Sequence, residues 1–415
     1  MGWSTRWAPT TTELEACVEC GLCLPHCPTY RLTGDEVASP RGRLNAMGAV
    51  AAGALEIDAD FEEAMGFCLQ CRACEAACPS MVPFGRAMEG ARAEVVAVRG
   101  GRRMRHRILG RWLARPWMIR IATFFAALAQ RLHLQRLAPH RLRTGLVGMR
   151  RLPFRPRSRR GTLHPAHGAQ VGVAGLLAGC VMDPWFGGVH DAAIDLLTRA
   201  GWEVVVPAGQ TCCGALAAHD GAAGPAAGLA ARNVAAFEGV DVVVSDAAGC
   251  GAHLAEYRHW AEGGADLGDR VRDVTVLVAE AIDAGRLPTL PGGRGPVALQ
   301  DACHLRHAQR VTAEPRRIVF AAGHEVVEID EVGMCCGAAG VYSVLRPETS
   351  AELGRTKADQ VRASGAVVVS SANPGCEIQL RSHLDDGFRI AHPIELYHEA
   401  LLASGVDRTA AVEGP

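Results

Sequence analysis

Short apolar runs that each end at a cysteine mark the second half of the chain. VGVAGLLAGC ends at Cys180, DVVVSDAAGC at Cys250, PVALQDAC at Cys303 and AVVVSSANPGC at Cys376. Apolar runs of this length, rich in valine and bounded by turn residues, are typical of buried strands. Helical stretches and a CCG triplet separate the runs, so the pattern predicts β-α-β units with thiols at the strand ends.

The thiols of this half recur in register. The first copy contains Cys180, Cys212, Cys213 and Cys250, and the second contains Cys303, Cys335, Cys336 and Cys376. The first three recur after 123 residues and the fourth after 126, which predicts two homologous lobes, 166–290 and 291–415. Inert core cysteines would have no reason to repeat in this way, so we interpret the eight thiols as ligands of a metal or cluster. Paired reactive or inert thiols are the alternative.

Helical patterns occupy the first part of the chain. Residues 39–53 and 58–67 are predicted to be helices, with Ser39 and Asp58 as N-caps and Pro40 in the first turn. The first domain, 1–95, is therefore expected to be mostly α-helical.

Two loops of this first domain carry the same unusual cysteine spacing. Residues 17–28 and 68–79 both read C-x2-C-x2-C-x3-C-P, which is the spacing of bacterial two-cluster ferredoxins. In those proteins the fourth cysteine of each loop ligates the other cluster. We therefore expect one 4Fe-4S cluster on Cys17, Cys20, Cys23 and Cys78, and a second on Cys68, Cys71, Cys74 and Cys27. A pair of zinc sites is the alternative, but zinc ribbons use separated C-x2-C hairpins or include histidine.

The region between the ferredoxin-like part and the lobes, 96–165, is basic and partly amphipathic. No Asp or Glu occurs from Val95 to Met182, and 18 arginines lie between Arg99 and Arg160. The spacing of its apolar residues predicts a helix with one apolar stripe, formed by Trp117, Ile121, Phe124, Phe125, Leu128 and Leu132. Its longest uncharged run is ten residues, against the roughly 20 that spanning a bilayer needs. Burial against the next domain, a partner protein and a membrane surface are the interpretations that remain. Nucleic acid is not expected, since the usual reading motifs are absent.

Composition and missing motifs limit the function further. The chain has 415 residues, 16 cysteines, and a start, MGWSTRWAPTTTELEA, without the apolar run of a secretory signal. We therefore expect a cytoplasmic protein, either free or peripheral on the inner face of the cytoplasmic membrane. No G-x-G-x-x-G follows a strand, because the Gly/Ala-rich stretch 221–228 lacks that spacing. No FAD or NAD site is expected on this chain.

Several segments resemble one family, the iron-sulfur subunits of glycolate oxidase (glycolate dehydrogenase), within the wider group with paired CCG domains. The segments are CPTYRLTGDE and SPRGR (27–43), CLQCRACEAACPS (68–80), TCCGAL (211–216), GCGAHLAEY (249–257), HLRHAQR (304–310), CCGAAGVYS (335–343) and SANPGC (371–376). The resemblance runs nearly from end to end. It implies an α+β multidomain protein, in which a helical two-cluster ferredoxin domain precedes two repeated α/β CCG lobes.

The resemblance also implies a function. Such a subunit works with FAD-binding flavoprotein subunits that oxidise glycolate to glyoxylate, and the electrons pass on to quinone. Because iron-sulfur clusters carry single electrons, this chain is expected to conduct electrons, to be inactive alone and to contain no catalytic residue that the sequence identifies. The alternatives are the iron-sulfur subunit of a glycerol-3-phosphate or lactate dehydrogenase complex, and a heterodisulfide or thiol reductase whose lobes are catalytic.

One departure from the wider group concerns the lobes. The related heterodisulfide reductases end each lobe motif in C-x2-C and hold a non-cubane cluster with five cysteines. Here His253 and Gln379 stand where the fifth cysteine would be, so that a cluster of that kind is not expected, whereas an ordinary cluster or a zinc is. His253, and His304 or His307 beside Cys303, are candidate substitute ligands.

Overall fold

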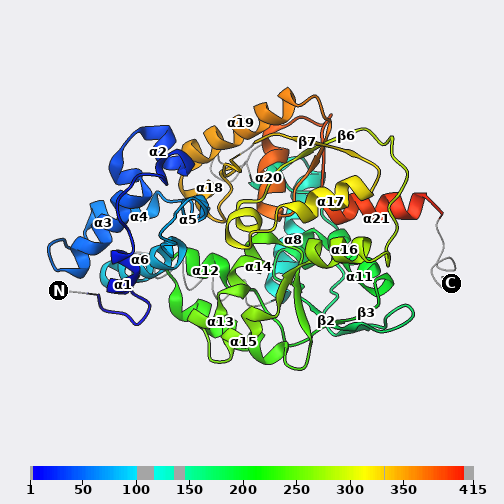
Figure 1. Ribbon diagram of the computed structural model, residues 1–415, viewed down its shortest axis with the longest axis horizontal. Helices are drawn as coiled ribbons and strands as arrows, with labels where there is room; N and C mark the ends of the chain where they lie inside the picture. The colour runs from blue at the N-terminus through cyan, green and yellow to red at the C-terminus, as the bar shows by residue number, and fades with distance from the viewer. Residues whose placement is uncertain (1–2, 101–115, 135–144, 331, 406–415) are drawn as a thin grey trace.

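The first part of the structure consists of helices around the two cysteine loops. The computed structural model describes residues 3–100, 116–134, 145–330 and 332–405, and no strand precedes Thr162 within these ranges (Figure 1). The first part contains α1 (Thr11–Glu15), η1 (Leu24–His26), α2 (Pro28–Thr33), η2 (Glu36–Ala38), α3 (Pro40–Ala51), α4 (Ala59–Gly66), α5 (Ala73–Ala76) and α6 (Phe84–Arg99). Met47, Met65 and Met88 are among the fully buried side chains at its centre.

The two helix starts predicted between the loops are confirmed. The Ser39 side chain accepts a hydrogen bond from the Gly42 amide at 3.0 Å, and Pro40 is the first residue of α3. The Asp58 side chain accepts one from the Phe61 amide at 2.9 Å at the start of α4. Both side chains thus satisfy amides that have no partner within the helix.

The second part begins with a five-stranded sheet in the order β1-β3-β2-β4-β5, in which β1 is antiparallel and the others are parallel. Its strands are β1 (Thr162–His164), β2 (Gly172–Leu176), β3 (Trp202–Val206), β4 (Val242–Ser245) and β5 (Val271–Asp273). Its helices are α10 (Met182–Trp185), α11 (Gly187–Arg199), α12 (Ala215–His219), α13 (Ala223–Ala236), α14 (Ala248–Ala255), η4 (Tyr257–His259), α15 (Gly264–Asp269) and α16 (Val274–Asp283). The first thiol of this lobe follows β2, and the last lies on α14 directly after β4.

A four-stranded parallel sheet repeats this arrangement in the order β7-β6-β8-β9. Its strands are β6 (Pro296–Leu299), β7 (Glu325–Glu328), β8 (Val368–Ser370) and β9 (Arg389–Ala391). Its helices are the π-helical turn η5 (His304–Ala308), α17 (Ala313–Ala321), α18 (Tyr342–Leu345), α19 (Pro347–Ala363), α20 (Pro374–His383) and α21 (Pro393–Ala403). Strands β6 to β9 correspond in order to β2 to β5, which confirms the predicted β-α-β repeat.

The two lobes pack back to back through helices. Helices α11 and α16 of the first lobe share one buried cluster with α17 and α21 of the second, including Leu196, Val278, Ile318 and Tyr397. All four of these side chains are almost fully buried. Because burial of apolar surface stabilises a contact by about 25 cal/mol per Å², this shared layer helps to hold the two lobes together.

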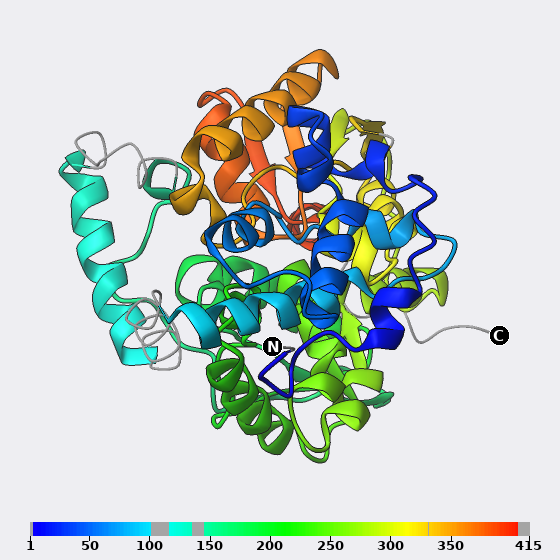
Figure 2. The ribbon, with the colours of Figure 1, turned by 90° about the vertical axis from the view of Figure 1, so that its left-hand side faces the viewer.

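Helix α8 (Pro116–Arg131) lies at the edge of the molecule, where Figure 2 shows it at the left of the view. One side of the helix contacts α10: the indole Nε1 of Trp185 donates to Thr123 Oγ1 at 2.9 Å, and Thr123 and Ala127 are fully buried. The predicted apolar stripe lies on other faces and is exposed, from 37% at Leu128 to 62% at Phe125. The interpretation that this stripe is buried against the next domain is therefore wrong. Helix α8 contacts that domain through small residues, Thr123 and Ala127, instead.

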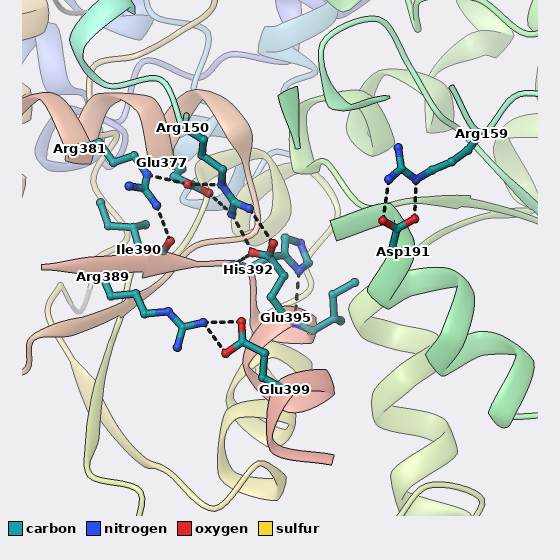
Figure 3. A network of polar contacts seen from close by, with 11 residues as sticks. Arg150, Arg159, Asp191, Glu377, Arg381, Arg389, Ile390, His392, Glu395 and Glu399 are labelled. Atoms are coloured by element: carbon teal, nitrogen blue, oxygen red, sulfur yellow. Dashed lines mark hydrogen bonds and ion pairs between the residues drawn. The ribbon is translucent and has the colours of Figure 1, made fainter. Parts of the chain in front are cut away.

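An arginine from the segment after α8 joins two helices of the second lobe. Arg150 donates two hydrogen bonds to Glu377 of α20, at 2.6 and 2.7 Å, and two to Glu395 of α21, at the same distances (Figure 3). The Glu377 side chain is only 3% exposed and that of Glu395 13%. Two buried carboxylates thus share one guanidinium, whose fork-shaped donors match both.

We predict that Arg150→Met lowers the free energy of unfolding by about 3 kcal/mol, because it leaves the buried Glu395 carboxylate without its cation and leaves Glu377 paired with Arg381 alone. Urea unfolding followed by circular dichroism measures the effect. Arg389→Met is the matched control: its pair with Glu399 is half exposed on both sides, so that its loss should cost less than about 1 kcal/mol. Equal effects of the two substitutions would contradict the role given to Arg150.

Candidate metal centres

The first predicted set of thiols lines one cavity. Cys17, Cys20, Cys23 and Cys78 all contribute to its wall, together with Cys74 and apolar side chains that include Leu44 and Phe84. Cys20 is exposed and the other three predicted ligands are half-buried. The fold thus brings the fourth cysteine of the second loop to the first loop, as crossed ligation requires.

The second predicted set is buried. Cys27, Cys68, Cys71 and Cys74 are each 7–8% exposed. Burial raises the pKa of the Cys74 thiol well above its ordinary value, and the nearby Cys71, Cys68 and Cys27 raise it further. Because iron binds the thiolate, metal binding must offset this cost, which couples the metal to the fold of the loop.

The segments GDE (34–36) and SPRGR (39–43) contact each other and the first cysteine loop through hydrogen bonds. Glu36 accepts a hydrogen bond from Ser39 Oγ at 2.7 Å and one from Arg41 Nε at 2.6 Å. Arg41 in turn donates to the Glu19 carbonyl of the first loop at 3.1 Å. This pairing explains why the two segments occur together: one carboxylate holds the start of α3 against the first cysteine loop.

Arg43 is a supporting residue to which the sequence reasoning assigned no role. Its side chain is fully buried, and it donates to the carbonyls of Ala38 and Ala64 at 2.6 and 2.9 Å. It also donates to Thr29 Oγ1, which lies 3.2 Å from Cys27 Sγ. A buried cation close to the second thiol set offsets the negative charge of thiolates there. The only available signal was an arginine inside an otherwise apolar helical face.

The four thiols of the first lobe lie together. Cys213 Sγ is 3.2 Å from Cys250 Sγ, and hydrogen bonds from the Cys180 and Cys213 thiols lower the pKa of Cys212 well below its ordinary value. The backbone turns directly after the two adjacent cysteines because Gly214 has a φ of +95°, a conformation that glycine adopts without strain.

Two polar side chains hold the backbone of this cysteine pair. Asn233 Nδ2 donates to the Cys212 carbonyl at 3.1 Å, and Tyr257 Oη donates to the Cys213 carbonyl at 2.6 Å. The two side chains also bond each other at 2.9 Å. The sequence reasoning missed both, since nothing in their local pattern distinguishes them from core polar residues.

The second lobe repeats the thiol arrangement. Hydrogen bonds from Cys335 and Cys376 lower the pKa of Cys336 well below its ordinary value, and Cys303 bonds Cys335. Gly337 has a φ of +87°, and a Cβ atom there would lie 2.7 Å from the Ser350 carbonyl oxygen. Only glycine therefore fits the position after the cysteine pair in this lobe.

The donor sets fit soft metals or iron-sulfur groups. All 16 cysteines are free, and they form the four sets described above. Thiolates are the ligands that iron-sulfur clusters and zinc prefer. Within the described residues, no three side chains of His, Cys, Asp or Glu surround a point where one metal ion would sit. The lobe thiols contact one another instead.

The second cysteine loop touches the thiols of the second lobe. Leu69, Cys71 and Ala73 pack in one cluster with Cys335, and Cys303 packs against it. Burial raises the pKa of Cys71, and the nearby Cys303 is the next largest cause. The buried thiol set is thus the one that faces the lobes, whereas the first set faces solvent.

The three candidate histidines differ in their contacts. His304 Nε2 is 3.0 Å from the Gln70 carbonyl oxygen, and His307 Nε2 is 3.0 Å from that of Gly333. His253 is 2% exposed, and burial lowers its pKa to about 4, which favours the neutral ring. His253 lies near Cys212 of the first-lobe thiol set. The hydrogen bonds of His304 and His307 lead instead to backbone carbonyls and not to thiols.

No helix in the described part of the chain has both the length and the apolar character needed to cross a bilayer.

Comparisons with known proteins agree with this architecture. Residues 13–82 match the family model of the 4Fe-4S dicluster domain, and residues 174–255 and 297–381 each match that of the cysteine-rich domain. The structure is thus a helical ferredoxin-type domain followed by two cysteine-rich α/β lobes.

Curated relatives extend the match to nearly the whole chain. A probable glycolate oxidase iron-sulfur subunit of Bacillus subtilis is 35% identical over 94% of both chains, and the glycolate oxidase iron-sulfur subunit of Escherichia coli is 29% identical over 97% of both. Lactate utilization protein A of Bacillus subtilis is 28% identical over 53% of this chain. Similarity to the first two proteins covers the ferredoxin-type domain and both lobes, and the chain therefore belongs to the family of glycolate oxidase iron-sulfur subunits.

Proposed function

We propose that this chain is the iron-sulfur electron-transfer subunit of a glycolate-oxidising complex. It takes electrons from an FAD-binding partner subunit that converts glycolate to glyoxylate, and it passes them towards quinone. The observation that carries the proposal is the placement of the two ferredoxin-type thiol sets, one at the surface and one buried against the lobes. Such a placement suits a chain that connects an external partner with its own interior.

Two 4Fe-4S clusters are assigned to the N-terminal part, 1–95. We assign the first to Cys17, Cys20, Cys23 and Cys78, and the second to Cys68, Cys71, Cys74 and Cys27. The cavity shared by the first set and the joint burial of the second support this division. When bound, such clusters carry one electron each, which suits an acceptor of electrons from a flavin.

The lobes, 166–290 and 291–415, are proposed to hold a further cluster or metal on their repeated thiols. The ligands would be Cys180, Cys212, Cys213 and Cys250 in the first lobe, and Cys303, Cys335, Cys336 and Cys376 in the second. Support comes from the convergence of four thiols in each lobe and from the burial of five of the eight, while the other three are half-buried. Cys71 packs in one cluster with Cys335 and Cys303, which would give electrons a short connection between the second cysteine loop and the second lobe.

A lactate or glycerol-3-phosphate complex and a thiol reductase are the competing functions. The lactate utilization relatives match only about half of this chain, whereas the glycolate oxidase relatives match both lobes and the ferredoxin-type domain. This difference in coverage favours glycolate as the partner's substrate.

We also propose that the region 96–165 places the protein on the inner face of the cytoplasmic membrane, where quinone is available. The exposed side chains Trp117, Phe124 and Phe125 of α8 form an apolar surface. The surrounding segment, 95–182, contains arginines but no acidic residue, so that its charge complements anionic lipid headgroups. An apolar helix face with basic surroundings is typical of interfacial membrane binding.

The crossed ligation can be tested with a reciprocal pair of variants. Cys27→Ser should remove the cluster whose other ligands are Cys68, Cys71 and Cys74, and Cys78→Ser should remove the other one. Each variant should lose about four irons per chain after anaerobic reconstitution and one of the two interacting EPR signals. If Cys27→Ser instead disturbs the more exposed cluster, the crossed assignment is wrong.

The electron-transfer role predicts that the isolated chain does not oxidise glycolate and that adding the flavoprotein subunits restores transfer to quinone. Cys71→Ser should abolish quinone reduction while glycolate still bleaches the flavin of the partner. Arg389→Met, a surface change, is the control that should transfer electrons at the normal rate. Glycolate turnover by the flavin-free chain would contradict the role, as would normal quinone reduction by the Cys71 variant.

Membrane binding predicts that the protein sediments with phosphatidylglycerol vesicles, and less so at high salt. The double substitution of Trp117 and Phe125 by Asp should weaken binding at least about tenfold, because two apolar side chains no longer enter the interface. Phe320→Asp is the matched control, since Phe320 is 61% exposed on α17. Binding should weaken further when three arginines outside the described residues, Arg102, Arg103 and Arg105, are changed to Glu. Binding that does not occur at any salt concentration would indicate a protein partner for α8 instead.

A further inference from the structure

The side chain of His253 is a buried imidazole that stands out among the described residues by its lack of hydrogen bonds. It is 2% exposed, and both ring nitrogens lack a hydrogen-bond partner within the described part of the chain. Rings of His219, Tyr257 and Trp260 surround it at centroid distances of 5.5 to 6.3 Å. Because burial of a polar group without a hydrogen bond destabilises a protein, a ligand or partner of this ring is the physical explanation to seek.

The position of His253 relates it to the first-lobe thiols. It lies one turn after Cys250 on α14, so the two side chains share a helix face. Its Nε2 atom would lie 3.3 Å from a Cβ atom at Gly214, the residue that follows the cysteine pair. One side of the ring thus faces the CCG turn.

Its other neighbours include a carboxylate from the ferredoxin-type domain. Glu89 of α6 lines the same small cavity as His253, and its Oε2 atom is buried and without a hydrogen-bond partner among the described residues. Glu89 Oε1 is 2.9 Å from His219 Nδ1. Histidines that bind a metal usually donate their second ring N–H to a carboxylate, and this arrangement offers one.

The second lobe provides an internal comparison. Gln379 stands at the position that corresponds to His253, and its Nε2 atom donates to the Ser350 carbonyl at 2.8 Å. It is therefore committed to the protein backbone. The two lobes consequently differ: the first offers four thiols and a free imidazole, and the second offers four thiols.

We propose that His253 is the fifth protein ligand of an iron-sulfur group held by the four thiols of the first lobe, with Glu89 as the partner of its second ring nitrogen. This inference deepens the proposed function, because it rests on metal binding by that lobe. Five donors exceed the four that a structural zinc takes, which favours a group with more than one iron. Replacement of a thiolate by a neutral imidazole reduces the negative charge of such a group and raises its reduction potential.

The test compares four variants of the full chain with the wild type after anaerobic reconstitution with iron and sulfide. Pulsed EPR of protein labelled with ¹⁵N-histidine should show a directly bound imidazole nitrogen in a signal that Cys213→Ser abolishes. His253→Cys should keep the iron of this site and lose the nitrogen coupling. His253→Ala should weaken iron binding there roughly tenfold. His307→Ala is the matched control, a buried histidine of the other lobe that should retain both the coupling and the iron.

The outcomes separate this inference from the proposed function. Nitrogen coupling that persists in His253→Cys, or that disappears in His307→Ala, overturns the assignment of the ligand. Equal iron content in the wild type and in Cys213→Ser also overturns it, because the first lobe then holds no iron. In each of these cases the two N-terminal cluster signals and electron transfer from glycolate to quinone still report on the proposed function.

Discussion

The second cysteine loop is the contact on which the arrangement of the three parts depends. Side chains from elsewhere in the chain form hydrogen bonds with backbone carbonyls of this loop. His304 bonds the Gln70 carbonyl, and Arg92 donates to the Cys68 carbonyl. Tyr342 donates to the carbonyl of Phe67, the residue just before the loop. Arg72 adds ion pairs at 2.5 Å to Glu75 within the loop and to Glu256 in the first lobe. Because buried carbonyls and charges must be paired, contacts from both lobes help to hold the loop in this position.

This dependence explains the different surroundings of the two thiol sets. The loop that contacts the lobes carries three of the buried thiols, and the fourth, Cys27, is held beside Thr29 and the buried Arg43. The other set keeps Cys20 at the surface. A single packing arrangement therefore produces one thiol set accessible to a partner and one directed towards the lobes, which is the property that the proposed electron transfer uses.

The lobes show how a duplicated fold can acquire different sites. Their strand orders correspond, both carry a glycine with positive φ after the cysteine pair, and both join the same layer of helices. The difference lies in single side chains such as His253 and Gln379, which do not alter the β-α-β framework. The backbone repeat thus preserves four thiols in each lobe, while one helix position decides whether a fifth donor is available.

Local signals in the sequence determined much of this protein. The duplicated cysteine spacing, the caps Ser39 and Asp58, and the valine-rich runs before the lobe thiols each depend on neighbouring residues, and the structure contains the corresponding loops, helices and strands. Only the tertiary structure decided that Cys71 lies near the second-lobe thiols, that the stripe on α8 faces outward and that His253 has no hydrogen-bond partner among the residues that the structure describes. The physical reason is that these properties arise from contacts between segments far apart in the chain. Local spacing and propensity set each element, whereas packing of all the elements decides which side chains meet and which remain exposed or unpaired.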